Sequence, residues 1–155
     1  MILPSAQTVT EPLFYKIAPN GIAFFTSRVL IRGSVITDHV DMEREAFRAG
    51  RELSTTGINC IAYCCTGSGI LQGIDGDREF CLRMEKGTGI PTTSTLSAVL
   101  EGLKVLRLKK LVVITPYQEA MHKAEESFFS SQWVPSRKEP EYGNQPRDKT
   151  LLGDS

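Results

Sequence analysis

The residues best suited to chemistry follow one apolar run. Cys60–Cys64 (CIAYC) has the composition of a buried strand, and Cys65, Thr66, Gly67 and Ser68 come directly after it. In open α/β sheets, ligands bind at the carboxyl ends of the strands. Backbone N–H groups beside a thiol there would lower its pKa from about 8.5, and the same groups can hold a carboxylate. The turn therefore predicts a thiolate nucleophile beside an anion site.

A second interpretation of Cys65 is purely structural, because cysteine is a small side chain that is commonly buried. Side chains alternate along a strand, so Cys64 should point to the opposite face and lie in the core. Cys60 and Cys81 are expected in the core as well. The four cysteines lack paired C-x2-C spacing, so we expect neither a zinc site nor a cofactor bound by them.

Two further segments carry candidate binding residues. The apolar run in Lys110–Thr115 (KLVVIT) predicts a fully buried strand, and Tyr117 follows it at a second carboxyl edge. Tyr117 would contact a ligand or would anchor the strand end with its ring buried and its hydroxyl in water. Ser5 and Gln7 lie in a polar loop after a short first strand. They would either bind the ligand or satisfy the loop backbone.

The elements that position these residues alternate between strands and helices. Alternation of this kind predicts parallel strands with helices on both faces, which is a three-layer α/β domain with a mainly parallel sheet. Ser94 can cap a helix whose apolar side is formed by Leu96, Val99, Leu100, Leu103 and Leu106. The remaining expected elements are a strand at 22–31, a helix from Thr37 or Asp38 to Ser54, a loop at 75–77, a helix at 77–86 and a helix at 118–130. We assign the domain to residues 1–130, and residues 131–155, rich in proline and charge, to a disordered tail.

Composition excludes several classes of partner. The chain has 155 residues with 18 basic and 18 acidic side chains, so no basic field favours nucleic acid or an anionic membrane. No apolar run approaches the ~20 residues of a membrane helix. The N-terminus shows no secretory signal, so we expect reduced thiols and a cytoplasmic location.

Three separated motifs carry a resemblance to a known family. Residues 4–12 (PSAQTVTEP) resemble the PSSNT-x-x-E loop of maleate cis–trans isomerases, and residues 63–68 (YCCTGS) resemble their Y-x-C-T-S-G segment. Residues 89–117, from GIPTT to ITPY, resemble a block shared with arylmalonate decarboxylases and the wider Asp/Glu racemase superfamily. The similarity covers roughly residues 2–130.

The resemblance implies a fold and a site. Members have two similar α/β domains that face each other across a cleft, each with a catalytic position at a strand end. Cys65 matches the cysteine of the first domain, and Thr66 and Tyr117 match residues of the carboxylate site. Gln7 stands where the isomerases have Asn, and Gly67 stands where Ser is usual. No second domain follows, so the chain resembles the truncated first half of a member.

The resemblance also implies a reaction. In the isomerases, a thiolate adds to the double bond of maleate, and rotation and elimination then give fumarate without a cofactor. The expected partner is a small carboxylate or dicarboxylate, and a homodimer would supply the opposite wall of the cleft. Two alternatives remain open, an inactive half-domain that acts as a binding or interaction module and an arylmalonate decarboxylase-like lyase. Whether this chain alone is an enzyme also remains open.

Overall fold

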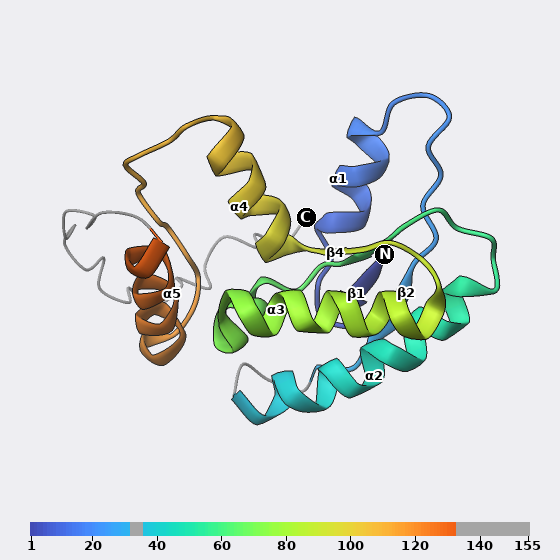
Figure 1. Cartoon of the computed structure of the whole chain (residues 1–155), viewed down its shortest axis with the longest axis horizontal. Coiled ribbons are helices and arrows are strands. Elements are labelled where there is room, and N and C mark those ends of the chain that lie inside the picture. Colours follow the sequence, from blue (N-terminus) through green and yellow to red (C-terminus); the bar gives the residue numbers. More distant parts are fainter. Residues whose placement is uncertain (32–35, 133–155) are drawn as a thin grey trace, which may run out of the picture.

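Parallel strands form the centre of the structure, a computed structural model that describes residues 1–31 and 36–132 (Figure 1). Within these residues the sheet has four strands in the order β2-β1-β3-β4. Every pair is parallel, with Ile2 beside both Ser27 and Tyr63, and Ile61 beside Thr92. The strands are β1 (Ile2–Pro4), β2 (Ser27–Val29), β3 (Ile61–Tyr63) and β4 (Thr92–Ser94).

Helices cover both faces of this sheet, which confirms the predicted three-layer α/β fold. Figure 1 shows α2 and α3 below the sheet, and α1 and α4 above it. The helices are α1 (Thr10–Ile17), α2 (Ile36–Ser54), α3 (Thr66–Thr88), α4 (Thr95–Val105) and α5 (Glu119–Gln132). Among the described residues, no helix is long and apolar enough to cross a membrane. The predicted tail lies outside the described residues from position 133 onward.

The two faces of the sheet have separate cores. On the face toward α2 and α3, Ile2, Ile61 and Tyr63 pack with Phe80 and other buried side chains. On the opposite face the cluster is smaller and consists of Met1, Leu3 and Cys64, with Phe14, Phe24 and Ala62 packed against it. Cys65 belongs to the larger cluster and Cys64 to the smaller one, which confirms that consecutive side chains point to opposite faces.

Helix α3 differs from the prediction of a loop at 75–77 followed by a helix at 77–86. It begins at Thr66 and runs to Thr88, with a kink at Gly73, whose backbone is left-handed (φ 71°). The sequence Asp75-Gly76-Asp77 suggested a loop or a helix cap at this point. Gly69, however, is required for packing: a Cβ on it would lie 2.9 Å from the Leu96 Cβ and 2.9 Å from Asp77 Oδ1. This glycine lets α3 approach α4 closely.

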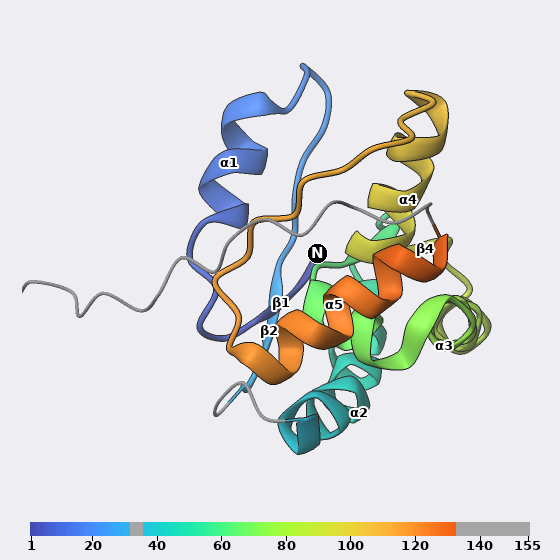
Figure 2. The ribbon, with the colours of Figure 1, turned by 90° about the vertical axis from the view of Figure 1, so that its left-hand side faces the viewer.

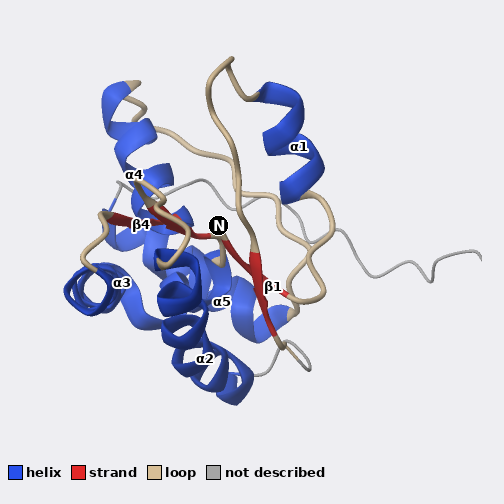
Figure 3. Ribbon diagram, turned by 90° about the vertical axis from the view of Figure 1, so that its right-hand side faces the viewer, coloured by secondary structure: helices blue, strands red, loops and turns tan. Residues whose placement is uncertain are grey.

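The predicted buried strand at 110–115 is wrong. These residues form no regular structure in the described chain, and Figure 3 shows the whole connection from α4 to α5 as loop. Val112 is 71% exposed and Ile114 is 93% exposed. In the preceding α4, Leu96 and Leu100 are buried as predicted, but Val99 and, just after the helix, Leu106 are exposed. Leu111, Val113 and Thr115 are half-buried, so one side of the run packs on the domain, but none of the described strands pairs with it.

The predicted strand at 22–31 is present over a shorter range. Only Ser27–Val29 pairs, because its partner β1 is three residues long, with Ile2 beside Ser27 and Pro4 beside Val29. The residues before Ser27 instead place Phe24 against Phe14 of α1. The length of the neighbouring strand therefore limits β2.

Candidate functional site

Cys65 lies where β3 passes directly into α3. Its backbone is extended (φ −133°, ψ 98°), and it occupies the N-cap position of the helix that starts at Thr66. The first N–H groups of a helix have no partner within the helix, and they carry the positive end of its dipole. Thr66 is half-buried, whereas Gly67 and Ser68 are buried. The structure therefore brings the predicted nucleophile and the predicted N–H donors together.

The protonation of Cys65 is opposite to the sequence expectation. The N–H groups of Ser68 and Gly67 and the Tyr63 side chain lower the pKa of the thiol, but burial raises its pKa more. Cys65 is only 6% exposed, so loss of hydration outweighs the favourable dipoles. The thiol is therefore predominantly protonated at neutral pH, and a reaction at Cys65 requires a proton acceptor.

The other cysteines occupy different environments. Cys64 and Cys81 are buried as predicted, and burial raises the pKa of Cys81 to about 11. Cys60 is exposed, so its predicted core position is wrong. It precedes the first paired residue of β3, and strand pairing does not carry it into the core. Within the described ranges, no group of three or more His, Cys, Asp or Glu side chains is arranged to hold a metal ion.

Tyr117 lies close enough to Cys65 for their charges to interact. Burial raises the pKa of the Tyr117 hydroxyl, and the negative charges of Cys65 and Glu125 raise it further. Figure 2 shows α5 beside α3, against which it packs. Tyr117 thus lies within electrostatic reach of Cys65 although the strand predicted to deliver it is absent.

Glu125, on the inner side of α5, is a buried carboxylate that the sequence motifs did not indicate. Its side chain is 6% exposed, and its Oε2 atom is buried without a hydrogen-bond partner in the described part of the chain. Met121 and Phe128, which flank it at helical spacing, are also buried. The sequence spacing carries a signal for this position. Glu125 lies four residues after Met121 and three before Phe128, so the three side chains share the inner side of the helix.

The loop after β1 gives its two predicted residues different surroundings. The Ser5 hydroxyl accepts a hydrogen bond from the Ile31 N–H (3.1 Å), so it serves the loop backbone. Arg28 Nη1 donates to the main-chain oxygens of Ser5 (3.2 Å) and Gln7 (2.6 Å) and fixes the loop. Gln7 Oε1 is buried without a partner among the described residues. Of the two side chains, that of Gln7 retains unused hydrogen-bonding capacity.

Ser68 contributes its backbone to the site and uses its side chain elsewhere. The Ser68 hydroxyl accepts a hydrogen bond from Gln72 Nε2 (3.1 Å), and the same nitrogen donates to Glu43 Oε2 (2.6 Å). Arg83 of α3 donates to the other carboxylate oxygen of Glu43. This chain of hydrogen bonds joins α2 to α3 and holds the first turn of α3 in place.

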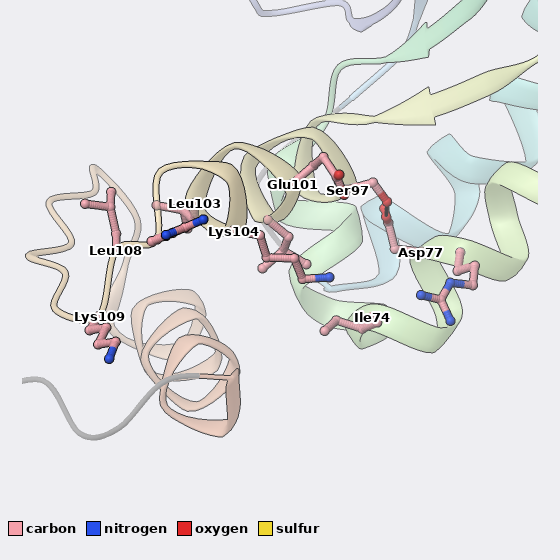
Figure 4. Close-up of a pocket in the computed structure, with 11 residues that line it drawn as sticks. Ile74, Asp77, Ser97, Glu101, Leu103, Lys104, Leu108 and Lys109 are labelled. Carbon is pink, nitrogen blue, oxygen red and sulfur yellow. Dashed lines mark hydrogen bonds between the residues drawn. The ribbon is translucent and has the colours of Figure 1, made fainter.

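A separate cavity of about 540 Å³ lies between α3, α4 and the turn that follows α4 (Figure 4). None of the predicted site residues lines it. Asp77 at its edge accepts hydrogen bonds from the hydroxyls of Ser94 (2.6 Å) and Ser97 (2.6 Å), so it fixes the start of α4. We therefore assign the candidate site to the Cys65 region.

Comparison with known proteins identifies the family of the chain. A family model described as arylmalonate decarboxylase matches residues 1–135. The chain belongs to the arylmalonate decarboxylase family. It is also similar to curated maleate isomerases. The relative from Pseudomonas putida is 24% identical over 132 residues, covering 77% of this chain and 53% of that protein. The relative from Geobacillus stearothermophilus is 25% identical over 134 residues, covering 78% and 53%. The chain thus spans about half the length of these relatives.

Solved structures share the fold of this arylmalonate decarboxylase family member. A crystal structure of a maleate isomerase from Pseudomonas putida superposes with a TM-score of 0.79 at 20% identity, covering 88% of this chain and 60% of that one. A mutant of arylmalonate decarboxylase in its liganded form gives 0.76 at 20% identity, covering 88% and 57%. A Nocardia farcinica maleate cis-trans isomerase mutant with a covalently bound succinylcysteine intermediate gives 0.78 at 16% identity, covering 88% and 60%.

Proposed function

We propose that this chain carries the first-domain half of a maleate isomerase-type site, in which Cys65 adds to the double bond of a small unsaturated dicarboxylate. The observation that carries the proposal is the position of Cys65 at the N-cap of α3, with Tyr117 within electrostatic reach. The curated relatives named maleate isomerase supply the substrate class. The expected location is a reducing compartment such as the cytoplasm.

The proposal gives each group a role. The N–H groups of Gly67 and Ser68, which already act on the Cys65 sulfur, stabilise negative charge at the start of α3. Thr66 and Tyr117 would orient one carboxylate of the substrate, and Gln7 would contact it from the loop after β1. When sulfur adds to one olefinic carbon, negative charge moves into the carboxylate attached to the second olefinic carbon. Preorganised hydrogen-bond donors are most effective where such charge develops. Rotation about the new single bond and elimination of the thiolate would release fumarate.

Two alternatives follow from specific observations. The matching family model is named for arylmalonate decarboxylase, which favours a lyase acting on a small dicarboxylic acid at the same anion site. The raised pKa of Cys65 favours a binding module without catalysis, because a protonated thiol is a poor nucleophile. A second copy of the chain would complete the site if the active form is a homodimer.

Incubation with maleate tests the proposal. We expect mass spectrometry to find Cys65 carrying one succinyl group, and Cys65→Ser to abolish this adduct. Steady formation of fumarate should be slow or absent, because a site with one wall does not exclude water from the reacting atoms. Fast turnover that Cys65→Ser abolishes would indicate that two copies complete the site. Absence of a Cys65 adduct, or release of CO₂ from an arylmalonate, would contradict the isomerase assignment.

A further inference from the structure

The cavity between α3 and α4 has an apolar interior. Leu100 is buried, Ile74 and Leu103 are half-buried, and Leu108 lines the cavity beyond the end of α4. Ile74 and Leu100 also belong to one of the hydrophobic core clusters, so packing holds this wall in place. The volume of about 540 Å³ lies within the range of small-molecule sites, roughly 300–1,000 Å³. The cavity is therefore large enough for an organic molecule with an apolar body.

Basic side chains surround this interior. Arg78 lies on α3, Lys104 lies in the last turn of α4, and Arg107 and Lys109 follow that helix. All four line the cavity and are exposed, so their charged groups lie at its rim. None of the four forms a salt bridge with another described residue. Figure 4 shows Lys104 on α4 and Lys109 beyond the end of that helix. The rim therefore offers positive charge that no described carboxylate pairs with.

The two carboxylates of the cavity do not neutralise this charge. Asp77 is buried, and its Oδ2 atom accepts the hydrogen bonds of two serine hydroxyls. Glu101 is exposed on α4 and forms no salt bridge with a described basic side chain. The dipole of α4 accounts for Lys104 in its last turn, but not for Arg78 on another helix. Four basic side chains against two acidic ones favour an anionic ligand.

The turn after α4 places Arg107 in an unfavourable backbone conformation. The Arg107 N–H donates to the Lys104 carbonyl oxygen (2.9 Å), and the Leu108 N–H donates to the Leu103 carbonyl oxygen (3.2 Å). These two bonds form a Schellman motif, in which glycine is the usual residue at the position of Arg107. Arg107 is left-handed (φ 53°), and among the described residues every other positive φ belongs to a glycine. Arginine in place of glycine at a strained position on the cavity rim indicates a functional side chain.

We propose that this cavity binds a small organic anion with an apolar body, such as a carboxylate that carries a short alkyl chain. The alkyl chain lies against Leu100 and Leu103, and the carboxylate lies at the rim, where Lys104 and Arg107 donate charge-assisted hydrogen bonds. None of the residues assigned to the Cys65 site lines this cavity. The second site is therefore independent of the function proposed above.

Isothermal titration calorimetry of the full chain with octanoate tests the proposal, with acetate, 1-octanol and inorganic phosphate as comparison probes. We expect one octanoate per chain, bound at least about 10-fold more tightly than each comparison probe, because it combines both recognised parts. Equal binding of 1-octanol would show that the charge is not recognised. Equal binding of acetate or phosphate would show that the apolar interior is not used. Either result, or absence of octanoate binding, would overturn the proposal.

Arg107→Gly is the most informative variant, because it removes the guanidinium and supplies the residue that suits the left-handed backbone. We expect octanoate binding to weaken by about 10-fold, the usual loss for a hydrogen bond to a charged group. The thermal unfolding temperature should stay the same or rise. Unchanged affinity would overturn the proposal. A lower unfolding temperature would assign Arg107 to stability and overturn its role in binding.

Two lysines provide a matched pair. Lys104 and Lys86 are both exposed and lie in the last turns of α4 and α3, but only Lys104 lines the cavity. We expect Lys104→Gln to weaken octanoate binding several-fold, roughly as for the loss of one charge-assisted hydrogen bond, and Lys86→Gln to bind like the parent. Equal effects of the two substitutions would indicate a general effect of surface charge and would overturn the proposal.

Nuclear magnetic resonance locates the bound anion. Octanoate should shift the backbone amide signals of residues 103–109 and leave those of residues 66–68 in place. Shifts confined to residues 66–68 would put the anion at the start of α3 and overturn the proposal. These readouts do not use the reaction of Cys65 with maleate, so the cavity proposal and the proposed function can fail separately.

Discussion

Two segments of this chain have the same sequence pattern and different structures. Both are apolar runs that lead into a helix through a candidate site residue, Cys65 in one case and Tyr117 in the other. The first run forms β3, and Cys65 leads directly into α3. The second, at 110–115, forms no strand and is a partly exposed connection before α5. The pattern alone therefore does not determine whether a strand forms.

The difference lies in the neighbours of each segment. β3 pairs with β1 on one side and with β4 on the other, and side chains pack against both of its faces. In the described structure, residues 110–115 have no strand beside them and Ile114 is almost fully exposed. Strand propensity measures how well a residue fits a paired, partly buried surface, so it has little effect where that surface is absent.

The largest effect should come from the paired segment. Ile61 of β3 is fully buried in the main core. We expect Ile61→Ala to lower the free energy of unfolding by about 2–5 kcal/mol, because it removes buried methyl groups and leaves a cavity. Urea unfolding followed by circular dichroism measures this. A loss below about 1 kcal/mol would show that β3 is not the centre of the core.

A smaller effect should come from the close approach of α3 to α4. Gly69→Ala places a methyl group 2.9 Å from the Leu96 Cβ and from Asp77 Oδ1, so we expect a loss of about 1–3 kcal/mol in the free energy of unfolding. Gly87→Ala, in the same helix, is the matched control because its Cβ would meet open space. It should be neutral or stabilising by up to about 1 kcal/mol. Equal effects of the two substitutions would contradict the close packing.

The smallest effect should come from the unpaired segment. Ile114 is 93% exposed, so Ile114→Ala should change the free energy of unfolding by less than about 0.5 kcal/mol. The same urea experiment compares it directly with Ile61→Ala, since both replace isoleucine with alanine. A loss comparable to that of Ile61→Ala would mean that residues 110–115 are covered in solution, and the contrast between the two segments would disappear.

Features determined by local chemistry could be predicted from the sequence. Ser94 caps α4 as predicted, its hydroxyl accepting a hydrogen bond from the Ser97 N–H at 2.9 Å. Gly57 follows the end of α2 with a left-handed backbone (φ 73°), as expected of a helix stop. The opposite faces of Cys64 and Cys65 follow from strand geometry alone. Each of these depends only on a few neighbouring residues.

Features determined by distant contacts could not be predicted. Burial of Cys65 reverses the expected direction of its pKa shift, and that burial depends on packing against several elements. The burial of Glu125 depends on how α5 packs beside α3, which no local pattern encodes. The exposure of Cys60 depends on where pairing of β3 begins. These are the features on which the chemistry of the site depends.

The direct passage from β3 into α3 has a consequence for how this site can change. A strand presents alternate faces at each residue, whereas a helix turns by about 100° per residue. With only Cys64 and Cys65 between Tyr63 and Thr66, one inserted residue would point the thiol to the other face of the sheet or rotate the helix away from it. Changes in length are therefore excluded at this junction, whereas residues 106–118 can gain or lose residues without disturbing a paired element. New specificity in this fold would consequently arise by lengthening the connection that carries Tyr117, while the position of the thiol stays fixed.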